Sequence, residues 1–404
     1  MLRPEEAWHR IASRVQPSAP VRMARDKALG LVLAEPVVAS VDLPQADVSA
    51  MDGYVLAGPA AAGERLPVVA TIAAGVTQAR TLAPRTAARI MTGAVVPAGG
   101  DRVVPVEQTD DGDVSVRIEI TPTAGAHIRR RAEVIARGAR LLEAGSHLVP
   151  GTLSLLAAHG YQAIQVFARP RVAILVTGDE VVASSAQPAP GQLRDSNGPF
   201  LQAALAGLGL GAERLGIAPD ERGPLAQCLR AGLAFDVLLV TGGVSMGTFD
   251  FAEELLRELG CELLVDAVAI APGKPLVIGR HAGGWVFGLP GNPASVMVTF
   301  WLFVRPLLNR LMGREDGFWH GALAAETCSA LPAGKGDRDR FLAATLRRRD
   351  QRLFADARLA HGSHDLRAYG QGRALLRIAP EAPPTPAGGL CSVLPLVDWP
   401  QDPS

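Results

Sequence analysis

A glycine-rich loop and a carboxylate lie close together at residues 241–250, a combination that can bind a phosphorylated ligand. The loop contains Gly242, Gly243 and Ser245, and such small residues leave backbone N–H groups open to an oxyanion. Asp250 follows, where its carboxylate could hold a divalent cation against those oxygens. An apolar run at 235–240 precedes the loop and indicates a buried strand of a parallel sheet. Taken alone, the loop is equally consistent with a turn that closes a strand.

A second stretch of the same design lies upstream. An apolar strand at 171–176 leads into Thr177, Gly178 and Glu180, and a further strand at 213–217 leads to Asp220. Helices are expected between these strands, the first capped by residues 195–197, and the alternation predicts a doubly wound α/β sheet. Ligands of such sheets bind at the carboxyl ends of the strands. Both glycine loops and both aspartates fall at those ends, which favours a functional site over two unrelated turns.

The remaining elements suggest four domains. A helix at 4–15 opens the chain, short β-rich runs follow between 68 and 120, and a helix at 151–160 comes after them. Strands at 263–270, 276–278 and 285–287 and a helix at 294–311 extend the α/β region. The expected domains are a discontinuous N-terminal domain (1–44 and 124–168), an inserted β domain (45–123), an α/β domain (169–313) and a C-terminal β domain (314–404).

Composition narrows the function classes. The 404 residues include 40 Lys and Arg and 40 Asp and Glu, so no net positive field favours a nucleic acid or an acidic membrane. The four cysteines are far apart, which argues against a disulfide framework and a structural zinc site. No signal peptide is visible, and the apolar segment Ala294–Val304 is too short to span a bilayer. We therefore expect a cytoplasmic protein with no nucleic-acid or membrane partner.

Six motifs, in order and with matching spacing, resemble the MoeA family of molybdopterin molybdenumtransferases, which includes the E domain of gephyrin. They are 49–54 (SAMDGY), 89–93 (RIMTG), 177–180 (TGDE), 241–247 (TGGVSMG), 272–275 (PGKP) and 288–293 (GLPGNP). The resemblance covers essentially the whole chain. It implies a multidomain α/β plus β fold: a discontinuous N-terminal domain with an inserted β domain, a MoaB/Mog-like α/β domain and a C-terminal β-barrel domain.

The same resemblance implies the Mg²⁺-dependent insertion of molybdate into adenylyl-molybdopterin, with release of AMP. It also implies a homodimer with shared sites, supplied with substrate by a Mog-like molybdopterin adenylyltransferase. The catalytic positions it implies are Asp52, Thr92, Glu180, Asp220 and Asp250, of which Glu180, Asp220 and Asp250 would hold Mg²⁺. The binding positions it implies are Thr177, Gly178, Asp195, Asn197, Gly242, Gly243, Ser245, Lys274, Pro290, Pro293, Arg338 and Ser363. Among these, Lys274, Arg338 and Ser363 resemble molybdate-binding positions, since a lysine, a guanidinium and a hydroxyl suit a tetrahedral dianion.

Three positions depart from the family pattern. Val134 stands where the family has an aspartate, and Ala267 and Ala271 stand where it has lysines. Losing two positive charges weakens the attraction for an anion, so we expect a raised molybdate requirement.

Two other functions are consistent with parts of the sequence. Residues 243–247 also fit the GxSxG nucleophile elbow of an α/β-hydrolase, with later histidines available. An elbow serine follows its strand almost at once, however, whereas Thr241, Gly242 and Gly243 intervene here. The three departures are also consistent with a non-catalytic paralogue that holds molybdopterin or scaffolds a partner. The retained acidic positions argue against that second alternative, because scaffolding needs no Mg²⁺ site.

Overall fold

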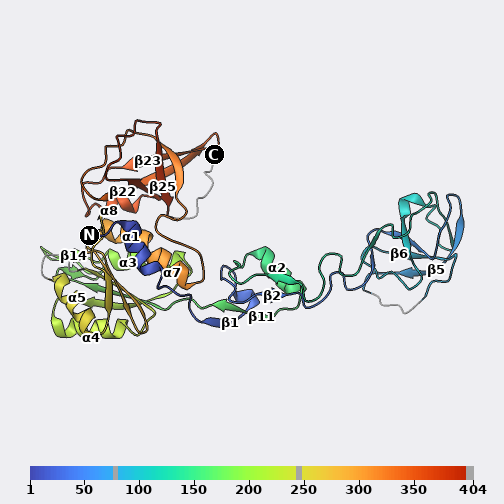
Figure 1. Ribbon diagram of the computed structural model, residues 1–404, viewed down its shortest axis with the longest axis horizontal. Coiled ribbons are helices and arrows are strands. Elements are labelled where there is room, and N and C mark those ends of the chain that lie inside the picture. Colours follow the sequence, from blue (N-terminus) through green and yellow to red (C-terminus); the bar gives the residue numbers. More distant parts are fainter. Residues whose placement is uncertain (76–80, 243–247, 397–404) are drawn as a thin grey trace. The chain divides into compact units, whose positions relative to one another are not determined.

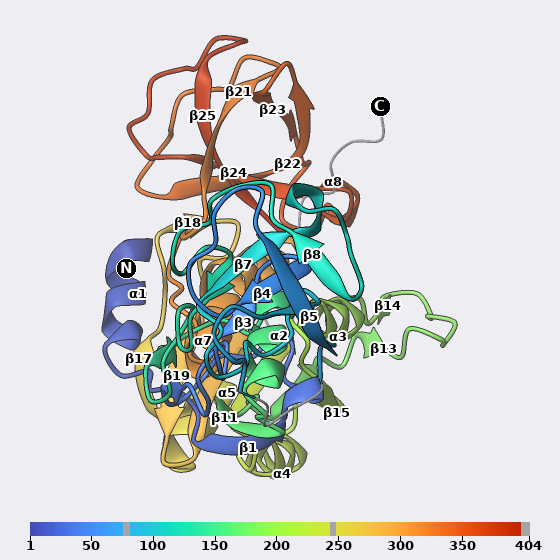
Figure 2. The same cartoon turned by 90° about the vertical axis from the view of Figure 1, so that its right-hand side faces the viewer.

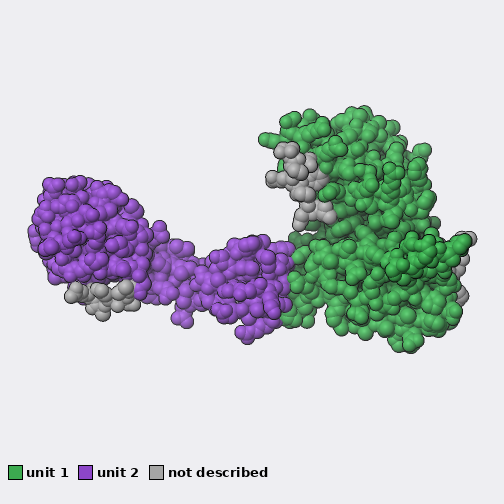
Figure 3. Space-filling model, turned by 180° about the vertical axis from the view of Figure 1, so that it is seen from behind, with its two compact units in different colours: residues 1–21, 167–404 green, residues 22–166 purple. Residues whose placement is uncertain are grey.

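The computed structural model describes residues 1–75, 81–242 and 248–396, with only the backbone described for 248–251 (Figure 1). The chain forms two compact units, one of residues 1–21 and 167–404 and one of residues 22–166 (Figure 3). The first 21 residues pack with the larger unit, where Trp8 and Ile11 of α1 (Pro4–Ala12) join its main apolar cluster. The four domain boundaries expected from the sequence stay predictions.

The larger unit is built on a six-stranded sheet with the order β15-β12-β16-β20-β19-β17. Four of its strands are parallel: β12 (Val172–Thr177), β15 (Ala212–Ala218), β16 (Val237–Gly242) and β20 (Gly284–Leu289). The two strands at one edge, β19 (Val277–His281) and β17 (Glu262–Val265), run antiparallel. The doubly wound α/β sheet is therefore confirmed, with an antiparallel edge that the sequence reading did not specify.

Helices cover both faces of this sheet because alternate residues of its buried strands point to opposite sides. Val237 and Leu239 of β16 pack with α1 and with α3 (Asn197–Gly207). Leu238 and Val240 pack on the other side, with α4 (Arg222–Gly232) and α5 (Thr248–Glu258). Two short strands, β13 (Val181–Val182) and β14 (Leu193–Arg194), pair in the loop before α3.

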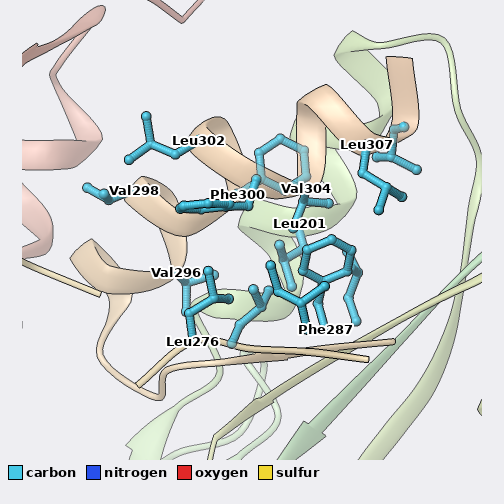
Figure 4. Packing of buried hydrophobic residues seen from close by; sticks show 14 of the residues in the cluster. Leu201, Leu276, Phe287, Val296, Val298, Phe300, Leu302, Val304 and Leu307 are labelled. Atoms are coloured by element: carbon cyan, nitrogen blue, oxygen red, sulfur yellow. The ribbon is translucent and has the colours of Figure 1, made fainter. Parts of the chain in front are cut away.

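The helix expected at 294–311 is present as three consecutive helical segments. These are α6 (Pro293–Thr299), a π-helical turn η3 (Phe300–Val304) and α7 (Arg305–Leu311). Pro306 lacks a backbone N–H, so the regular hydrogen-bond ladder cannot run through it, which accounts for the wider turn before it. Phe300, Leu302 and Val304 are fully buried, and the segment packs on Phe287 of β20 and Leu201 of α3 (Figure 4).

The C-terminal region forms a closed five-stranded barrel, as expected (Figure 2). Its strands are β21 (Leu323–Thr327), β22 (Asp339–Arg349), β23 (Arg352–Arg358), β24 (Ala374–Ile378) and β25 (Leu390–Pro395), with α8 (Leu366–Gly370) before β24. The strand expected at 263–270 is wrong as a single element. Its first half is β17 of the α/β sheet, and its end is β18 (Ile270–Ala271), which pairs with the start of β22.

The smaller unit contains a five-stranded sheet with the order β7-β4-β6-β5-β8. The strands are β4 (Gly53–Leu56), β5 (Arg65–Ile72), β6 (Ala87–Ile90), β7 (Arg102–Pro105) and β8 (Ser115–Arg117). Outside this sheet lie the pairs β1 (Pro20–Ala24) with β11 (Ala163–Phe167), β2 (Val37–Val38) with β10 (Arg140–Leu142) and β3 (Val48–Ser49) with β9 (Ile128–Arg129), the helix α2 (Pro150–Ala158) and the 3-10 turns η1 (Arg25–Lys27) and η2 (Val106–Gln108).

Two arginines of the run 129–131 in the smaller unit form ion pairs with aspartates from an earlier part of the chain. Arg130 pairs with Asp47, and Arg131 pairs with Asp42, each at 2.6 Å. Asp42 also accepts the backbone N–H of Arg137, and this bond and Arg131 lower the pKa of Asp42. These arginines therefore join neighbouring chain segments. Among the helices of the described residues, none is long and apolar enough to cross a membrane.

Candidate functional site

A cavity of about 400 Å³ lies between the α/β sheet and the C-terminal barrel within the larger unit. Three residues implied as molybdate-binding, Lys274, Arg338 and Ser363, line it together although they are up to 89 positions apart in the sequence. Pro290 lines it as well, and Pro293 is the first residue of α6, directly after the lining residue Asn292. The fold thus brings these positions to one place.

The loop that carries Lys274 is held rigidly by its backbone. The Lys274 carbonyl accepts the N–H groups of Val268 and Leu276, at 3.0 and 2.9 Å. Gly273 has a φ of +115°, and a Cβ there would lie 2.9 Å from side-chain atoms of both Ile270 and Thr299. Only glycine satisfies that conformation and that packing, so the loop presents Lys274 from a fixed position.

The barrel wall of the cavity is anchored by hydrogen bonds and a buried ion pair. The Asn292 side-chain amide donates to the Ser363 hydroxyl at 2.8 Å, and the Ala294 N–H donates to the Ser363 carbonyl at 3.2 Å. At the start of β22, the buried carboxylate of Asp339 accepts Arg377 Nε at 2.6 Å. Because Asp339 stands between Arg338 and Arg340, this pair fixes the strand from which both cavity arginines project.

The electrostatics of the cavity suit an oxyanion. Lys274, Arg338 and Arg340 line it, and the part of its lining that the structure describes contains no aspartate or glutamate. Asn292 and Tyr369 add polar groups to the wall. Sequence reasoning missed Arg340, Asn292 and Tyr369. The alternation of side chains along a strand could have indicated Arg340, since it places that residue on the same face as Arg338.

The two glycine loops meet at the carboxyl ends of neighbouring strands. Thr177 of β12 and Gly242 of β16 are register partners, and Gly242 has a φ of +125°. A Cβ on Gly242 would lie 1.8 Å from the Thr177 carbonyl oxygen, so no larger residue fits there. Gly178 is likewise left-handed, with a φ of +132°. Gly243 and Ser245 lie outside the described residues.

A buried network links these strand ends to the cavity. The Asn197 side-chain amide donates to the Thr241 hydroxyl at 3.0 Å and to the Gly291 carbonyl at 2.8 Å. Thr241 in turn donates to the carbonyl of Pro290, a residue of the cavity wall, at 3.0 Å. Asn197 therefore holds the loop 288–293 against β16.

Asp195 is fully occupied by partners within the protein. Its carboxylate accepts the Gly198 N–H at 2.8 Å and forms an ion pair with Arg214. In this structure it shapes the beginning of α3, and its expected contact with substrate stays a prediction.

A group of acidic residues lies past the ends of β12 and β15. Burial raises the pKa of Asp220 above its ordinary value, and the charges of Asp179 and Glu180 raise it further. The backbone N–H of Asp220 donates to Asp179 at 3.0 Å, while Asp220 Oδ1 is buried without a partner among the described residues. The described residues contain no group of three metal-ligating side chains, and the Asp250 side chain lies outside the description. The expected Mg²⁺ set of Glu180, Asp220 and Asp250 therefore stays a prediction.

Asp52 and Thr92 meet in the smaller unit. One carboxylate oxygen of Asp52 accepts both the backbone N–H of Thr92, at 2.6 Å, and its hydroxyl, at 2.8 Å. These two donors lower the pKa of Asp52, the backbone bond contributing more. These bonds favour the charged form of the carboxylate, which is exposed.

The three departures have different structural settings. Ala271 lines the cavity, so a lysine there would add a charge to its wall. Ala267 is not among the described lining residues, and its carbonyl accepts the Leu2 N–H at 3.4 Å. Val134 is 77% exposed in the smaller unit. Only Ala271 therefore bears directly on the cavity.

A hydrolase triad finds no support among the described residues. Ser245 lies outside them, and no histidine ring is hydrogen-bonded to a carboxylate within the described ranges. His281 Nδ1 accepts the Gly283 N–H at 3.1 Å, and burial lowers the pKa of this histidine. Its ring is thus engaged in a local turn.

Two family models match parts of the chain between residues 2 and 310, and known proteins match most of its length. Residues 2–160 match the MoeA N-terminal region (domain I and II), and residues 173–310 match a probable molybdopterin binding domain. A Nostoc molybdopterin molybdenumtransferase is 39% identical over 301 residues, covering 72% of this chain and 69% of that protein. Molybdopterin molybdenumtransferase 2 of Mycobacterium tuberculosis is 37% identical over 340 residues, covering 80% and 84%. A crystal structure of a Pyrococcus horikoshii molybdopterin biosynthesis MoeA protein, 27% identical, matches with a TM-score of 0.84 over 99% of this chain and 100% of its own. The chain belongs to the MoeA family of molybdopterin molybdenumtransferases.

Proposed function

We propose that this enzyme of molybdenum cofactor biosynthesis inserts molybdate into adenylyl-molybdopterin and releases AMP in a Mg²⁺-dependent reaction. One observation carries the proposal: Lys274, Arg338 and Ser363 converge on a cavity whose lining, among the described residues, contains no carboxylate. Molybdate is a tetrahedral dianion, and cations with a hydroxyl donor supply the hydrogen bonds and charge that such an anion needs.

The adjoining strand ends supply a place for the rest of the substrate. Gly178 and Gly242 turn the chain at these strand ends with left-handed φ values, and we assign the pyrophosphate of adenylyl-molybdopterin to the loops that they open. The carbonyl of Pro290, on the cavity wall, accepts the hydroxyl of Thr241 at the end of β16. A substrate bound at these strand ends therefore has the proposed molybdate cavity as a neighbour.

The acidic residues past these strands fit a hard divalent cation. Asp220 Oδ1 is buried without a partner among the described residues, and neighbouring carboxylates raise the pKa of Asp220. A cation removes that mutual repulsion, and Mg²⁺ prefers carboxylate oxygens. We assign Asp220, Glu180 and Asp250 to this role. When bound, Mg²⁺ would neutralise charge on the phosphate oxygens during cleavage of the adenylyl bond.

We also propose that the enzyme acts in the cytoplasm as a homodimer, with Asp52 and Thr92 of one subunit serving the α/β domain of the other. The hydrogen-bonded Asp52–Thr92 pair supports a functional role for this exposed carboxylate. A Mog-like molybdopterin adenylyltransferase would supply the substrate, because adenylylated molybdopterin is the reactant.

The test is AMP release from adenylyl-molybdopterin, measured with and without Mg²⁺ and molybdate. The proposal expects release that requires both ions and that collapses in Asp250→Asn, which keeps the size of the side chain but removes its charge. Asp266→Asn is a matched control, since this exposed aspartate is not among the described residues that line the cavity. A protein that only binds molybdopterin would retain the ligand and release no AMP. Wild-type release by Asp250→Asn would remove that residue from the metal site.

A further inference from the structure

The strand pair at the cavity wall places Arg340 beside Ala271. β18 and β22 run parallel, with Ile270 opposite Asp339 and Ala271 opposite Arg340. Strands in such pairs lie about 4.8 Å apart, and register partners project to the same face. Ala271 and Arg340 both line the cavity. A cationic side chain therefore stands next to the position where the family pattern has a lysine.

The Arg340 guanidinium has no acidic partner among the described residues. The ion pairs in that part of the chain engage its neighbours instead: Arg338 lies 3.9 Å from Asp337, and Arg377 pairs with Asp339. Arg340 is half-buried, and its charge partly offsets the raised pKa that burial gives the Tyr369 phenol. Tyr369 donates its hydroxyl to the Phe341 carbonyl at 2.6 Å, so that hydroxyl proton is already committed.

The position of Arg340 is set by the buried strand start. Asp339 is 1% exposed and is held by Arg377, and the Asp339 N–H donates to the Ala269 carbonyl at 2.9 Å. The alternation of a strand then turns Arg340 to the face opposite the Asp339 side chain. An unpaired, partly desolvated cation is thus built into the cavity wall.

We propose that Arg340 is a specificity-determining residue that binds the oxyanion and supplies the positive charge absent at Ala271. This inference rests on the proposed function and names a contact for its anionic substrate. A guanidinium presents a planar fork that can donate two hydrogen bonds to one tetrahedral oxyanion, whereas an ammonium acts as a point charge. With this charge in place, we expect a molybdate requirement close to that of a relative with the lysine, and not the raised requirement that Ala271 by itself would predict.

A double-mutant cycle tests the inference, with the apparent molybdate constant for AMP release and calorimetric molybdate binding as readouts. Arg340→Gln is expected to raise both constants about tenfold, the effect of losing one charge-assisted hydrogen bond. Ala271→Lys in the Arg340→Gln background restores the net charge of the wild type and is expected to bring both constants back to within about threefold of it. Ala271→Lys alone is expected to change them by less than about threefold, because Arg340 already supplies a charge there.

Matched variants separate this role from general charge and from folding. Arg347→Gln removes an exposed arginine seven residues along the same strand, roughly 23 Å away at a strand rise of 3.3 Å per residue, and is expected to leave both constants unchanged. Arg340→Lys keeps the charge and is expected to fall between the wild type and Arg340→Gln. Thermal unfolding of each variant confirms the fold.

The outcomes distinguish the inference from the proposed function. If the wild type neither binds molybdate nor releases AMP in response to it, the proposed function and this inference both fail. If the wild type does both and Arg340→Gln keeps the wild-type molybdate constants, this inference alone is overturned. Failure of Ala271→Lys to improve Arg340→Gln would also overturn it, because the two positions would then not share one anion.

Discussion

The side-chain amide of Asn292 donates a hydrogen bond to the hydroxyl of Ser363 at 2.8 Å, joining the start of α6 to a loop of the C-terminal barrel. Both residues line the cavity. Ser363→Ala removes the acceptor and a donor for the anion, so we expect a several-fold rise in the apparent molybdate constant. The cost in the free energy of unfolding should be only about 1 kcal/mol, the net value of one hydrogen bond.

Asn292→Ala and the double variant complete the test of that pair. If the hydroxyl acts on the anion, Ser363→Ala raises the molybdate constant further even when Asn292 is already replaced. Non-additive losses of stability with an unaltered molybdate constant would instead limit Ser363 to an architectural contact with Asn292.

Gly242 should tolerate no side chain. An added Cβ would lie 1.8 Å from the Thr177 carbonyl oxygen, and the φ of +125° is itself unfavourable for other residues. We expect Gly242→Ala to lower the free energy of unfolding by on the order of 3 kcal/mol, measured by urea denaturation. Gly216→Ala is the matched control, because Gly216 has a φ of +96° but no atom within 4 Å of the added Cβ. Equal losses in both variants would mean that the close approach of β12 and β16 is unimportant.

Asp220 should destabilise the metal-free protein at neutral pH. Its pKa is raised in the folded state, by burial first and then by Asp179 and Glu180, so the folded protein holds the proton more tightly than the unfolded chain. The stability that this group contributes is fully present below the pKa that it has in the unfolded chain. That stability is lost as the pH rises through the pKa that it has in the folded protein. Asp220→Asn should therefore raise the melting temperature slightly at neutral pH without metal, and this gain should shrink toward acid.

Added Mg²⁺ should make the wild type melt at a higher temperature than Asp220→Asn. A ligand that binds only the folded state stabilises it, so Mg²⁺ should raise the melting temperature of the wild type but not of Asp220→Asn. A wild-type melting temperature that ignores Mg²⁺ would count against the proposed metal site, while an equal response of the two proteins would place the cation elsewhere.

The proposed shared site predicts complementation between subunits. Asp52 belongs to the smaller unit and Glu180 to the larger one. Asp52→Ala and Glu180→Ala should each be nearly inactive, and mixing them should restore part of the activity through heterodimers with one intact site. Subunit exchange is verified by mass spectrometry with one partner isotopically labelled. Confirmed exchange without recovered AMP release would show that each subunit acts alone.

The α/β sheet and the β structure of the C-terminal domain were predictable because their signals are local, whereas the closed barrel was expected only from the family resemblance. Short apolar runs such as 172–176 and 237–240, rich in β-branched residues and leucine, favour strands buried on both faces, and the small residues after them mark the strand ends. The prediction of one strand at 263–270 was wrong because the apolar run is continuous in sequence. In the structure the chain leaves one sheet after Val265 and joins another at Ile270. That division depends on tertiary pairing with β22, which no local pattern contains.

The cavity was predictable only in part. Resemblance to family motifs pointed to Lys274, Arg338 and Ser363, and the structure brings all three together. Arg340 and Asn292 were missed because their roles depend on partners distant in sequence, Ala271 and Ser363. Asp195 shows the converse, since its carboxylate is already satisfied by Gly198 and Arg214.

The most direct test of the proposed function is the ratio of molybdenum incorporated to AMP released in a single turnover of purified enzyme with adenylyl-molybdopterin and Mg²⁺. We expect one molybdenum atom in the pterin product for each AMP, with both yields falling together in Lys274→Ala as molybdate is made limiting. AMP release that is equally fast without molybdate, or a product that contains no molybdenum, would contradict the proposed function.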